Sequence, residues 1–232
     1  MSRDSGRRSA LVTGASSGIG FAIARMLGDD GFDVTITSSS GERIEAAAGQ
    51  LNGVHAVAGD VASQPDCERV IAAHRERFGG LDVLVNSAGI LRQSDIVDLE
   101  LAQWEEHFSV NMTGTFLMAT LCLPMLRAAR GLIVNIASIA GKEANPGLGL
   151  AAYAATKAAV ISFTQSLNAE LEVDGVRALA ICPGFVDTPM ATISRMAGSM
   201  MIQPADVAEV VRMALRLSPH ARIPEVIIEM AP

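Results

Sequence analysis

The sequence predicts one doubly wound α/β domain over residues 1–232, with a parallel sheet of about seven strands and helices on both faces. Short runs of β-branched and apolar residues alternate with longer segments of helical periodicity, and most of the short runs are apolar throughout. Strands are apolar on both sides when helices cover both faces of their sheet. Because the chain shows no internal repeat, low-complexity stretch or linker, we expect a single domain, with residues 1–8 flexible.

The individual elements follow from the same two periodicities. Continuous or alternating apolar runs bounded by polar residues and glycines predict strands at residues 10–13, 33–37, 54–58, 81–86, 132–137, 176–182 and 225–229. Apolar residues repeated every three or four positions predict helices at residues 18–27, 65–78, 101–129, 151–172 and 204–217.

Composition excludes several classes of protein. Half of the residues are hydrophobic and 19% are charged, which is enough for a sizeable core and unlike a disordered chain. The net charge is −7 without a block of like charge, which argues against binding of DNA or RNA. The most apolar long stretch, residues 116–132, is broken by Arg127 and Arg130, so we expect no membrane span.

The start of the chain and its cysteines indicate a reducing compartment. No apolar region of the kind found in secretory signals follows the charged first residues. Cys67, Cys122 and Cys182 are odd in number and far apart in sequence, which is typical of reduced thiols rather than of a disulfide framework or a metal site. We therefore expect a cytoplasmic protein without a bound metal.

A glycine-rich segment follows the first predicted strand and leads into a helix. It reads Thr13-Gly14-Ala15-Ser16-Ser17-Gly18-Ile19-Gly20. Glycines permit a sharp turn, let backbone N–H groups approach a pyrophosphate and let the helix pack on the strand, so the segment fits a variant of the dinucleotide-binding fingerprint. A tight turn without any ligand would use glycine in the same way.

The same letters permit a third interpretation. Residues 14–18 match G-x-S-x-G, the nucleophile elbow of α/β-hydrolases, with Ser16 as nucleophile and Asp187 or Asp206, then His220, later in the chain. However, the motif follows the first strand, so no earlier strand could supply the loop that completes an oxyanion hole. This position argues against a serine hydrolase.

The only tyrosine, Tyr153, lies four residues before Lys157, one of only two lysines among 18 basic residues. In a helix this spacing places both side chains on one face. The pair could be an aromatic ring stacked on a lysine stem. A nearby ammonium group would also lower the pKa of a phenol toward the range useful for acid–base catalysis. Because the chain uses arginine for nearly all other cations, we favour the catalytic interpretation.

In these motifs the chain resembles the short-chain dehydrogenase/reductase family of the single-domain kind, with matches in order from residue 10 to residue 190. The family's Thr-Gly-x-x-x-Gly-x-Gly and Tyr-x-x-x-Lys motifs match the two segments above. The further matches are Asp60-Val61, Asn86-Ser87-Ala88-Gly89, Asn111, Ser138, Pro183-Gly184 and Thr188. The chain departs from the family pattern at Ser87, where a second Asn is usual, and at its C-terminus, which lacks the frequent Asp-Gly-Gly ending.

The resemblance implies a Rossmann fold and hydride transfer between NAD(P) and a carbonyl or alcohol substrate. It implies that Tyr153 is the acid/base, that Lys157 holds the nicotinamide ribose and lowers the Tyr153 pKa, that Ser138 stabilises the developing alkoxide, and that Asn111 binds a water linked to Lys157. Without the resemblance, Ser138 and Asn111 would be ordinary polar residues. The expected cofactor-binding residues are Gly14, Ser16, Ser17, Gly18, Ile19, Gly20, Ser38, Ser39, Arg43, Asp60, Val61, Asn86, Ala88, Gly89, Tyr153, Lys157, Pro183, Gly184, Val186 and Thr188.

The choice between the two nicotinamide cofactors depends on the end of the second strand. A carboxylate there would bind the ribose diol of NAD and repel a 2′-phosphate. Ser38 occupies this position, followed by Ser39 and Ser40, with Arg43 within one helical turn, while Asp33 lies at the other end of the strand. We therefore expect NADP(H) rather than NAD(H).

The substrate pocket is expected between residues 139–150 and residues 185–201. These segments are small, apolar and rich in methionine, which suits a largely apolar carbonyl or alcohol, although methionine at helical spacing also fits a plain core. The methionines are Met190, Met196, Met200 and Met201. Three arginines (Arg127, Arg130 and Arg195) leave reduction of 3-oxoacyl thioesters open.

Two further expectations concern assembly and activity. The resemblance implies a homodimer or homotetramer built through the helices around Asn111 and Tyr153, and the alanine-rich residues 151–159 would allow close helix packing. A regulator that binds NADP without catalysis is an alternative to an enzyme. All four catalytic positions are occupied, which argues against that alternative.

Overall fold

The computed structural model describes residues 6–142, 147–193 and 201–231. Most of the N-terminal segment that we expected to be flexible (residues 1–5), together with Arg195, Met196 and Met200, therefore lies outside the described residues. Just before the first strand, the guanidinium group of Arg8 lies 4.3 Å from the centre of the Phe32 ring.

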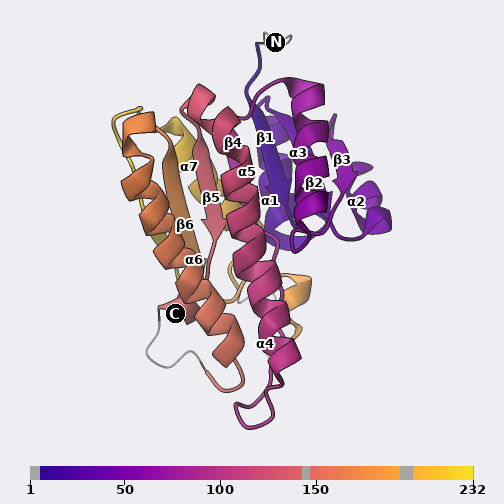
Figure 1. The fold of residues 1–232 in the computed structure, drawn as a ribbon, viewed down its shortest axis with the longest axis vertical. Coiled ribbons are helices and arrows are strands. Elements are labelled where there is room, and N and C mark those ends of the chain that lie inside the picture. The colour runs from indigo at the N-terminus through magenta and orange to yellow at the C-terminus, as the bar shows by residue number, and fades with distance from the viewer. Residues whose placement is uncertain (1–5, 143–146, 194–200, 232) are drawn as a thin grey trace.

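The described residues form a seven-stranded sheet in which every strand pairs in parallel with its neighbours (Figure 1). Its spatial order is β3-β2-β1-β4-β5-β6-β7, so the chain winds outward from β1 in both directions. This is the predicted doubly wound class. The strands are β1 (Ser9–Thr13), β2 (Asp33–Ser38), β3 (His55–Ala58), β4 (Val83–Asn86), β5 (Leu132–Ile136), β6 (Arg177–Pro183) and β7 (Glu225–Ile228).

Helices cover both faces of the sheet. In Figure 1, α3 (Gln64–Phe78), α5 (Gly114–Ala129) and α6 (Ala151–Glu170) lie in front of the strands, and α1 (Gly18–Asp29) and α7 (Pro204–Arg216), which pack against each other, lie behind them. The short 3-10 helices are η2 (Ile139–Gly141), η3 (Glu172–Asp174) and η4 (Pro189–Ile193).

Two hydrophobic cores result, one on each side of the sheet. Val12 packs in the core beneath α1 and α7, whereas its neighbour Leu11 packs in the core beneath α3, α5 and α6. Both side chains are fully buried because successive residues of a strand point to opposite faces. Cys67 and Cys122 belong to the second core, and all three cysteines are buried and free.

One helix was not predicted from the sequence. Helix α2 (Gly41–Ala48) is short and buries only Ile44 and Ala47, so its sequence offers few apolar positions from which to predict a helix. Ser40 begins it as an N-cap, with its hydroxyl accepting a hydrogen bond from the Arg43 backbone N–H at 3.3 Å.

The predicted long helix at residues 101–129 is three consecutive helical segments. A π-helix, η1 (Phe108–Thr113), joins α4 (Leu101–His107) to α5. Such wider turns occur mostly within α-helices and are frequent at functional sites. Here the π-helix contains Asn111, one of the candidate catalytic residues.

By length and composition the same run, residues 101–129, is sufficient to cross a membrane, contrary to our expectation from its arginines. A core helix of a soluble protein can meet this criterion too, and α5 packs against α3 and the sheet. The finding is therefore weak evidence for a membrane segment.

Candidate active site

The glycine loop after β1 has a conformation that requires glycine. Gly14 has φ +63°, and a Cβ atom there would lie 2.7 Å from the backbone N and Cα of Ala88. A Cβ atom at Gly20 would lie 2.6 Å from the carbonyl oxygen of Gly14. The loop is thus packed against the segment after β4 and against the start of α1 by direct backbone contact.

The N-terminus of α1 is open to an anion. The helix begins at Gly18, its first turn contains no acidic residue, and the side chain of the N-cap residue Ser17 makes no capping hydrogen bond. The first backbone N–H groups of a helix have no partner within the helix, and the helix dipole makes this end positive. The loop and helix start therefore form a phosphate cradle of the expected kind.

Thr13 connects this loop to the segment after β4. Its hydroxyl oxygen accepts hydrogen bonds from the backbone N–H groups of Ser87 and Ala88, both at 3.1 Å. Asn86 precedes them as a buried residue whose side-chain amide donates to the Asn135 side-chain oxygen at 2.9 Å. These contacts hold the carboxyl ends of β1, β4 and β5 together.

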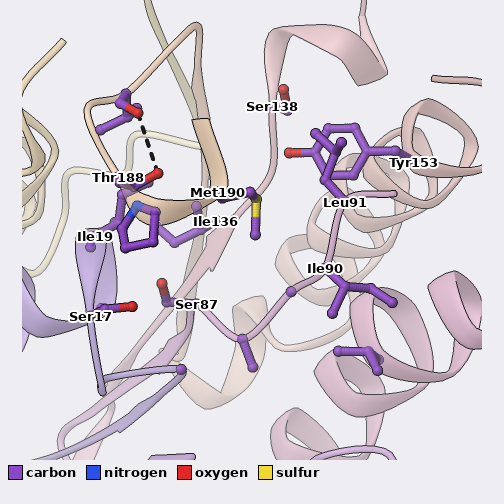
Figure 2. A pocket seen from close by; sticks show the side chains of 18 of the residues that line it. Ser17, Ile19, Ser87, Ile90, Leu91, Ile136, Ser138, Tyr153, Thr188 and Met190 are labelled. Atoms are coloured by element: carbon purple, nitrogen blue, oxygen red, sulfur yellow. Dashed lines mark hydrogen bonds between the residues drawn. The ribbon is translucent and has the colours of Figure 1, made fainter. Parts of the chain in front are cut away.

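A cavity of about 620 Å³ opens at the carboxyl ends of the strands (Figure 2). All of the predicted catalytic and cofactor-binding residues line it except Asn86 and Asn111. In an open parallel sheet, ligands bind at this edge, where the strand order reverses on either side of β1. The structure thus gathers the sequence motifs around one cavity.

Asn111 is buried behind the cavity wall and holds it in place. Its side-chain oxygen accepts a hydrogen bond from the Ile90 backbone N–H at 2.7 Å, and its amide donates to the Ile90 carbonyl at 3.0 Å and to the Thr156 hydroxyl at 3.1 Å. A Cβ atom at Gly89 would lie 3.2 Å from the Asn111 side-chain oxygen and 3.5 Å from the Lys157 ammonium nitrogen. The glycine therefore allows both side chains to approach the same point.

Ser138, just after β5, and Tyr153, near the start of α6, both line the cavity. Figure 2 shows the Tyr153 hydroxyl on the same side of the cavity as the Ser138 side chain. The Ser138 hydroxyl oxygen also accepts from the Ala140 backbone N–H at 3.2 Å. Lys157 lies one turn after Tyr153, with its ammonium nitrogen 5.6 Å from the ring centre and donating to the Ile136 carbonyl at 2.8 Å.

The Tyr153 pKa corrects one of our expectations. We expected Lys157 to lower it, but burial of the phenol raises the pKa of Tyr153 above its usual value, and the polar Ser138 side chain opposes this shift only in part. Burial also lowers the pKa of Lys157, to about 8. The ammonium group bonds to the Ile136 carbonyl and faces the ring. A phenol that stays protonated suits a proton donor.

A comparison with protein families covers most of the chain. The family described as short chain dehydrogenase matches residues 8–197. The chain belongs to this family. It is an oxidoreductase by that membership, with the Rossmann fold that the family's solved structures share.

Individual short-chain dehydrogenases match nearly the whole chain. An uncharacterised oxidoreductase of Staphylococcus aureus strain USA300 is 37% identical over 222 residues, which cover 94% of this chain and 95% of the relative. A variant of actinorhodin polyketide ketoreductase, solved with NADPH, is 33% identical with a TM-score of 0.88 and covers 96% of this chain and 95% of its own. A 3-ketoacyl-(acyl-carrier-protein) reductase from Brucella melitensis, solved with NADH, is 28% identical with a TM-score of 0.87 and covers 96% of both chains.

The part of the cavity that would receive the adenosine ribose contains hydroxyl groups and a cation. Ser38 ends β2, and its hydroxyl donates to the Ser40 carbonyl at 3.1 Å. Arg43 lines the cavity from the first turn of α2 and has no ion-pair partner among residues that the structure describes. Asp60 lies further along the wall, where its side chain accepts from the Ala62 backbone N–H at 2.9 Å.

The structure adds wall residues that the motif analysis did not identify. Some directly follow the Asn-Ser-Ala-Gly motif, and including the residues next to a matched motif would have found them. Others come from α4, η1 and the residue before α6, where only tertiary packing brings them to the cavity. The added wall residues from these segments are Ile90, Leu91, Arg92, Glu106, Val110 and Leu150.

The predicted substrate segments contribute in part. Phe185 and Met190 line the cavity, whereas Met201 does not. The residues needed for a serine hydrolase are not brought together around Ser16. Asp206 accepts from the Gln203 backbone N–H at 2.8 Å in the cap of α7, and His220 is exposed and outside the cavity wall.

Proposed function

We propose that this short-chain dehydrogenase interconverts a largely apolar ketone or aldehyde and the corresponding alcohol, with NADP(H) as hydride carrier and Tyr153 as the acid/base. One observation carries the proposal. The phosphate cradle at Gly14–Gly20 and the hydroxyl groups of Ser138 and Tyr153 line a single cavity, so a dinucleotide bound at one end would place its reactive ring near both hydroxyl groups.

The residues of this chain supply the proton and the polar contacts. The nicotinamide, when bound, donates or accepts the hydride. In reduction, the Tyr153 hydroxyl donates its proton to the carbonyl oxygen, which becomes the alcohol oxygen, and in oxidation the tyrosinate takes that proton back. The Ser138 hydroxyl stabilises the negative charge that develops on the same oxygen. Lys157 would hold the nicotinamide ribose through the N–H donors of its ammonium group.

The proposal of NADP(H) is supported by charge. No carboxylate ends β2, and Arg43, which forms no ion pair with the residues that the structure describes, lines the cavity together with Ser38 and Ser39, where it could bind a 2′-phosphate. The two solved relatives described above hold NADPH and NADH respectively, so they do not decide between the cofactors. The proposal therefore rests on the residues at the end of β2 and on Arg43. The measurement is kcat/KM for both cofactors. A clearly higher kcat/KM with NADH would refute the proposal of NADP(H).

The substrate class is supported by the apolar wall and by the names of solved relatives. Leu91, Val110, Leu150, Phe185 and Met190 favour a substrate with an apolar body. Reduction of a 3-oxoacyl thioester is a second candidate because one similar protein is named a polyketide ketoreductase and another a 3-ketoacyl-(acyl-carrier-protein) reductase.

The experiment follows the absorbance of NADPH with ketones, aldehydes, quinones and 3-oxoacyl thioesters. Tyr153→Phe should abolish turnover of any substrate found while NADPH still binds, as measured by fluorescence. The other lysine provides a matched control for Lys157, because Lys142 pairs with Glu225 and lies outside the cavity wall. Lys157→Met should remove most of the activity and Lys142→Met should not. Unchanged turnover in Tyr153→Phe would exclude this mechanism.

We also propose that the protein is a homo-oligomer that assembles through α4, α5 and α6. The Phe116 side chain on α5 is 44% exposed and contacts Phe163 on α6, with ring centres 6.0 Å apart, which leaves an aromatic surface for a second copy. Light scattering during gel filtration tests this, and a monomer at micromolar concentration would contradict it.

A further inference from the structure

An ion pair lies in the wall of the cavity, directly after Leu91, which packs against the cluster that contains Tyr153. The guanidinium group of Arg92 donates two hydrogen bonds to the carboxylate of Glu106, from Nε and from Nη2, each at 2.8 Å. Both residues line the cavity, and their side chains are 56% and 42% exposed, so the pair faces both the cavity and solvent. The neighbouring wall residues Ile90, Leu91, Val110 and Leu150 are apolar.

The backbone positions of the two residues are fixed independently of the ion pair. The Arg92 backbone N–H donates to Nε2 of His107 at 3.1 Å. His107 is fully buried, directly follows Glu106 in α4, and donates from Nδ1 to the Gln103 carbonyl at 2.7 Å. The loop after β4 is therefore attached to α4 without help from the charged groups, and loss of either charge leaves this attachment intact.

Stability does not explain the pair. Exposed ion pairs contribute about 0–1 kcal/mol because water screens the charges and ordering two long side chains costs entropy. The pair does have an electrostatic consequence for the cavity. With both partners present, the pair adds no net charge to the cavity wall, whereas either partner alone would add one unit charge.

We propose that Arg92 and Glu106 form a specificity-determining pair that selects uncharged substrates. Paired, they cancel each other's field over the apolar wall, so a substrate with a carboxylate or an ammonium group at its far end gains no partner there and loses its hydration. Unpaired, Arg92 would attract a carboxylate and Glu106 an ammonium group. This inference rests on the proposed function, since it assumes that the substrate occupies the space beside Tyr153.

The test uses three forms of one ketone that the wild type reduces, with a methyl ester, a carboxylate or a primary ammonium group at the same far position. Glu106→Gln should raise kcat/KM for the carboxylate relative to the ester by about fivefold and lower it for the ammonium form, the effect of one unit charge at about 4 Å under bulk-water screening. Arg92→Gln should do the reverse. The double variant should return both ratios to near their wild-type values, and added salt should weaken each shift.

A second exposed ion pair provides the matched control. Arg127 and Asp174 bond at 2.7 Å with side chains 51% and 30% exposed, and neither lines the cavity. Arg127→Gln changes the net charge as Arg92→Gln does, and it should leave the three ratios unchanged. If the ester is reduced but the ratios stay constant in both cavity variants, or if Arg127→Gln shifts them equally, the inference is wrong while the proposed function stands. If the wild type reduces no carbonyl compound at all, the proposed function fails and the inference fails with it.

Discussion

A buried histidine makes the stability of this protein depend on pH in a predictable direction. His74 lies on α3 and is fully buried, with Nδ1 2.8 Å from the Thr35 hydroxyl on β2 and Nε2 2.9 Å from the Gly80 carbonyl. Since a carbonyl can only accept, Nε2 carries the proton and Nδ1 accepts from Thr35. The neutral ring thus joins β2, α3 and the segment before β4, and protonation would add a charge in the core.

The size of the effect follows from the pKa. Burial lowers the pKa of His74 from 6.5 to about 4, although the hydrogen bond to Gly80 opposes this shift. The unfolded chain therefore binds more protons than the folded one between these two pH values. The stability that the neutral His74 ring contributes is thus present above pH 6.5 and is lost as the pH falls toward 4. The difference of about 2.5 corresponds to about 3.4 kcal/mol over the whole window. About 2 kcal/mol of this is lost between about pH 7.5 and about pH 5.

Urea unfolding at a fixed protomer concentration measures this loss. The wild type should lose about 2 kcal/mol more than His74→Gln between about pH 7.5 and about pH 5, because glutamine does not titrate. His220→Gln, which changes an exposed histidine, should behave like the wild type. Equal losses in the wild type and His74→Gln would show that His74 does not control the acid sensitivity.

Three substitutions test the site itself. Gly14→Ala should abolish cofactor binding because its Cβ atom would lie 2.7 Å from backbone atoms of Ala88. The control is Gly31→Ala, where φ is also positive (+84°) but the space is open; it should cost only about 1–2 kcal/mol of stability and keep NADPH affinity. Intact binding in Gly14→Ala would contradict the steric argument. Arg43→Gln should lower kcat/KM for NADPH about tenfold or more and leave NADH nearly unchanged, since only the 2′-phosphate differs; an equal loss with both cofactors would count against a phosphate contact. Asn111→Ala should destabilise the protein by about 2 kcal/mol in urea unfolding, because it leaves the backbone N–H and carbonyl of Ile90 without their partner. An unchanged urea midpoint would show that the Asn111 side chain does not hold the cavity wall.

The sequence predicted the sheet well because the inner strands are buried on both faces and are therefore largely apolar. The run predicted at residues 10–13 is β1 with one residue added at its start, and the ends of the other strands lie within two residues of their predicted positions. Helix α2 was missed because only Ile44 and Ala47 of its eight residues face the core. The π-helix around Asn111 was missed because apolar periodicity does not distinguish an extra residue in one turn from regular helix.

The candidate site was predictable where its residues lie within contiguous motifs. Ser138 and Tyr153 come from separate motifs, and parallel topology brings both to the same edge of the sheet. Glu106 carries no such signal, because its place in the wall depends on how α4 packs against the loop after β4. The direction of the Tyr153 pKa was predicted wrongly because the sequence shows the nearby charge of Lys157 but not the depth at which the phenol is buried.

The contact between Gly14 and Ala88 restricts how this enzyme can diverge or be redesigned. The clash that a side chain would cause there involves backbone atoms, so no neighbouring side chain can move to relieve it. The opposite wall is different, since Leu91, Val110 and Leu150 enter the cavity as side chains from three separate segments. Mutational libraries directed at these three positions can therefore alter the range of substrates while the end of the cavity that recognises the dinucleotide keeps its shape.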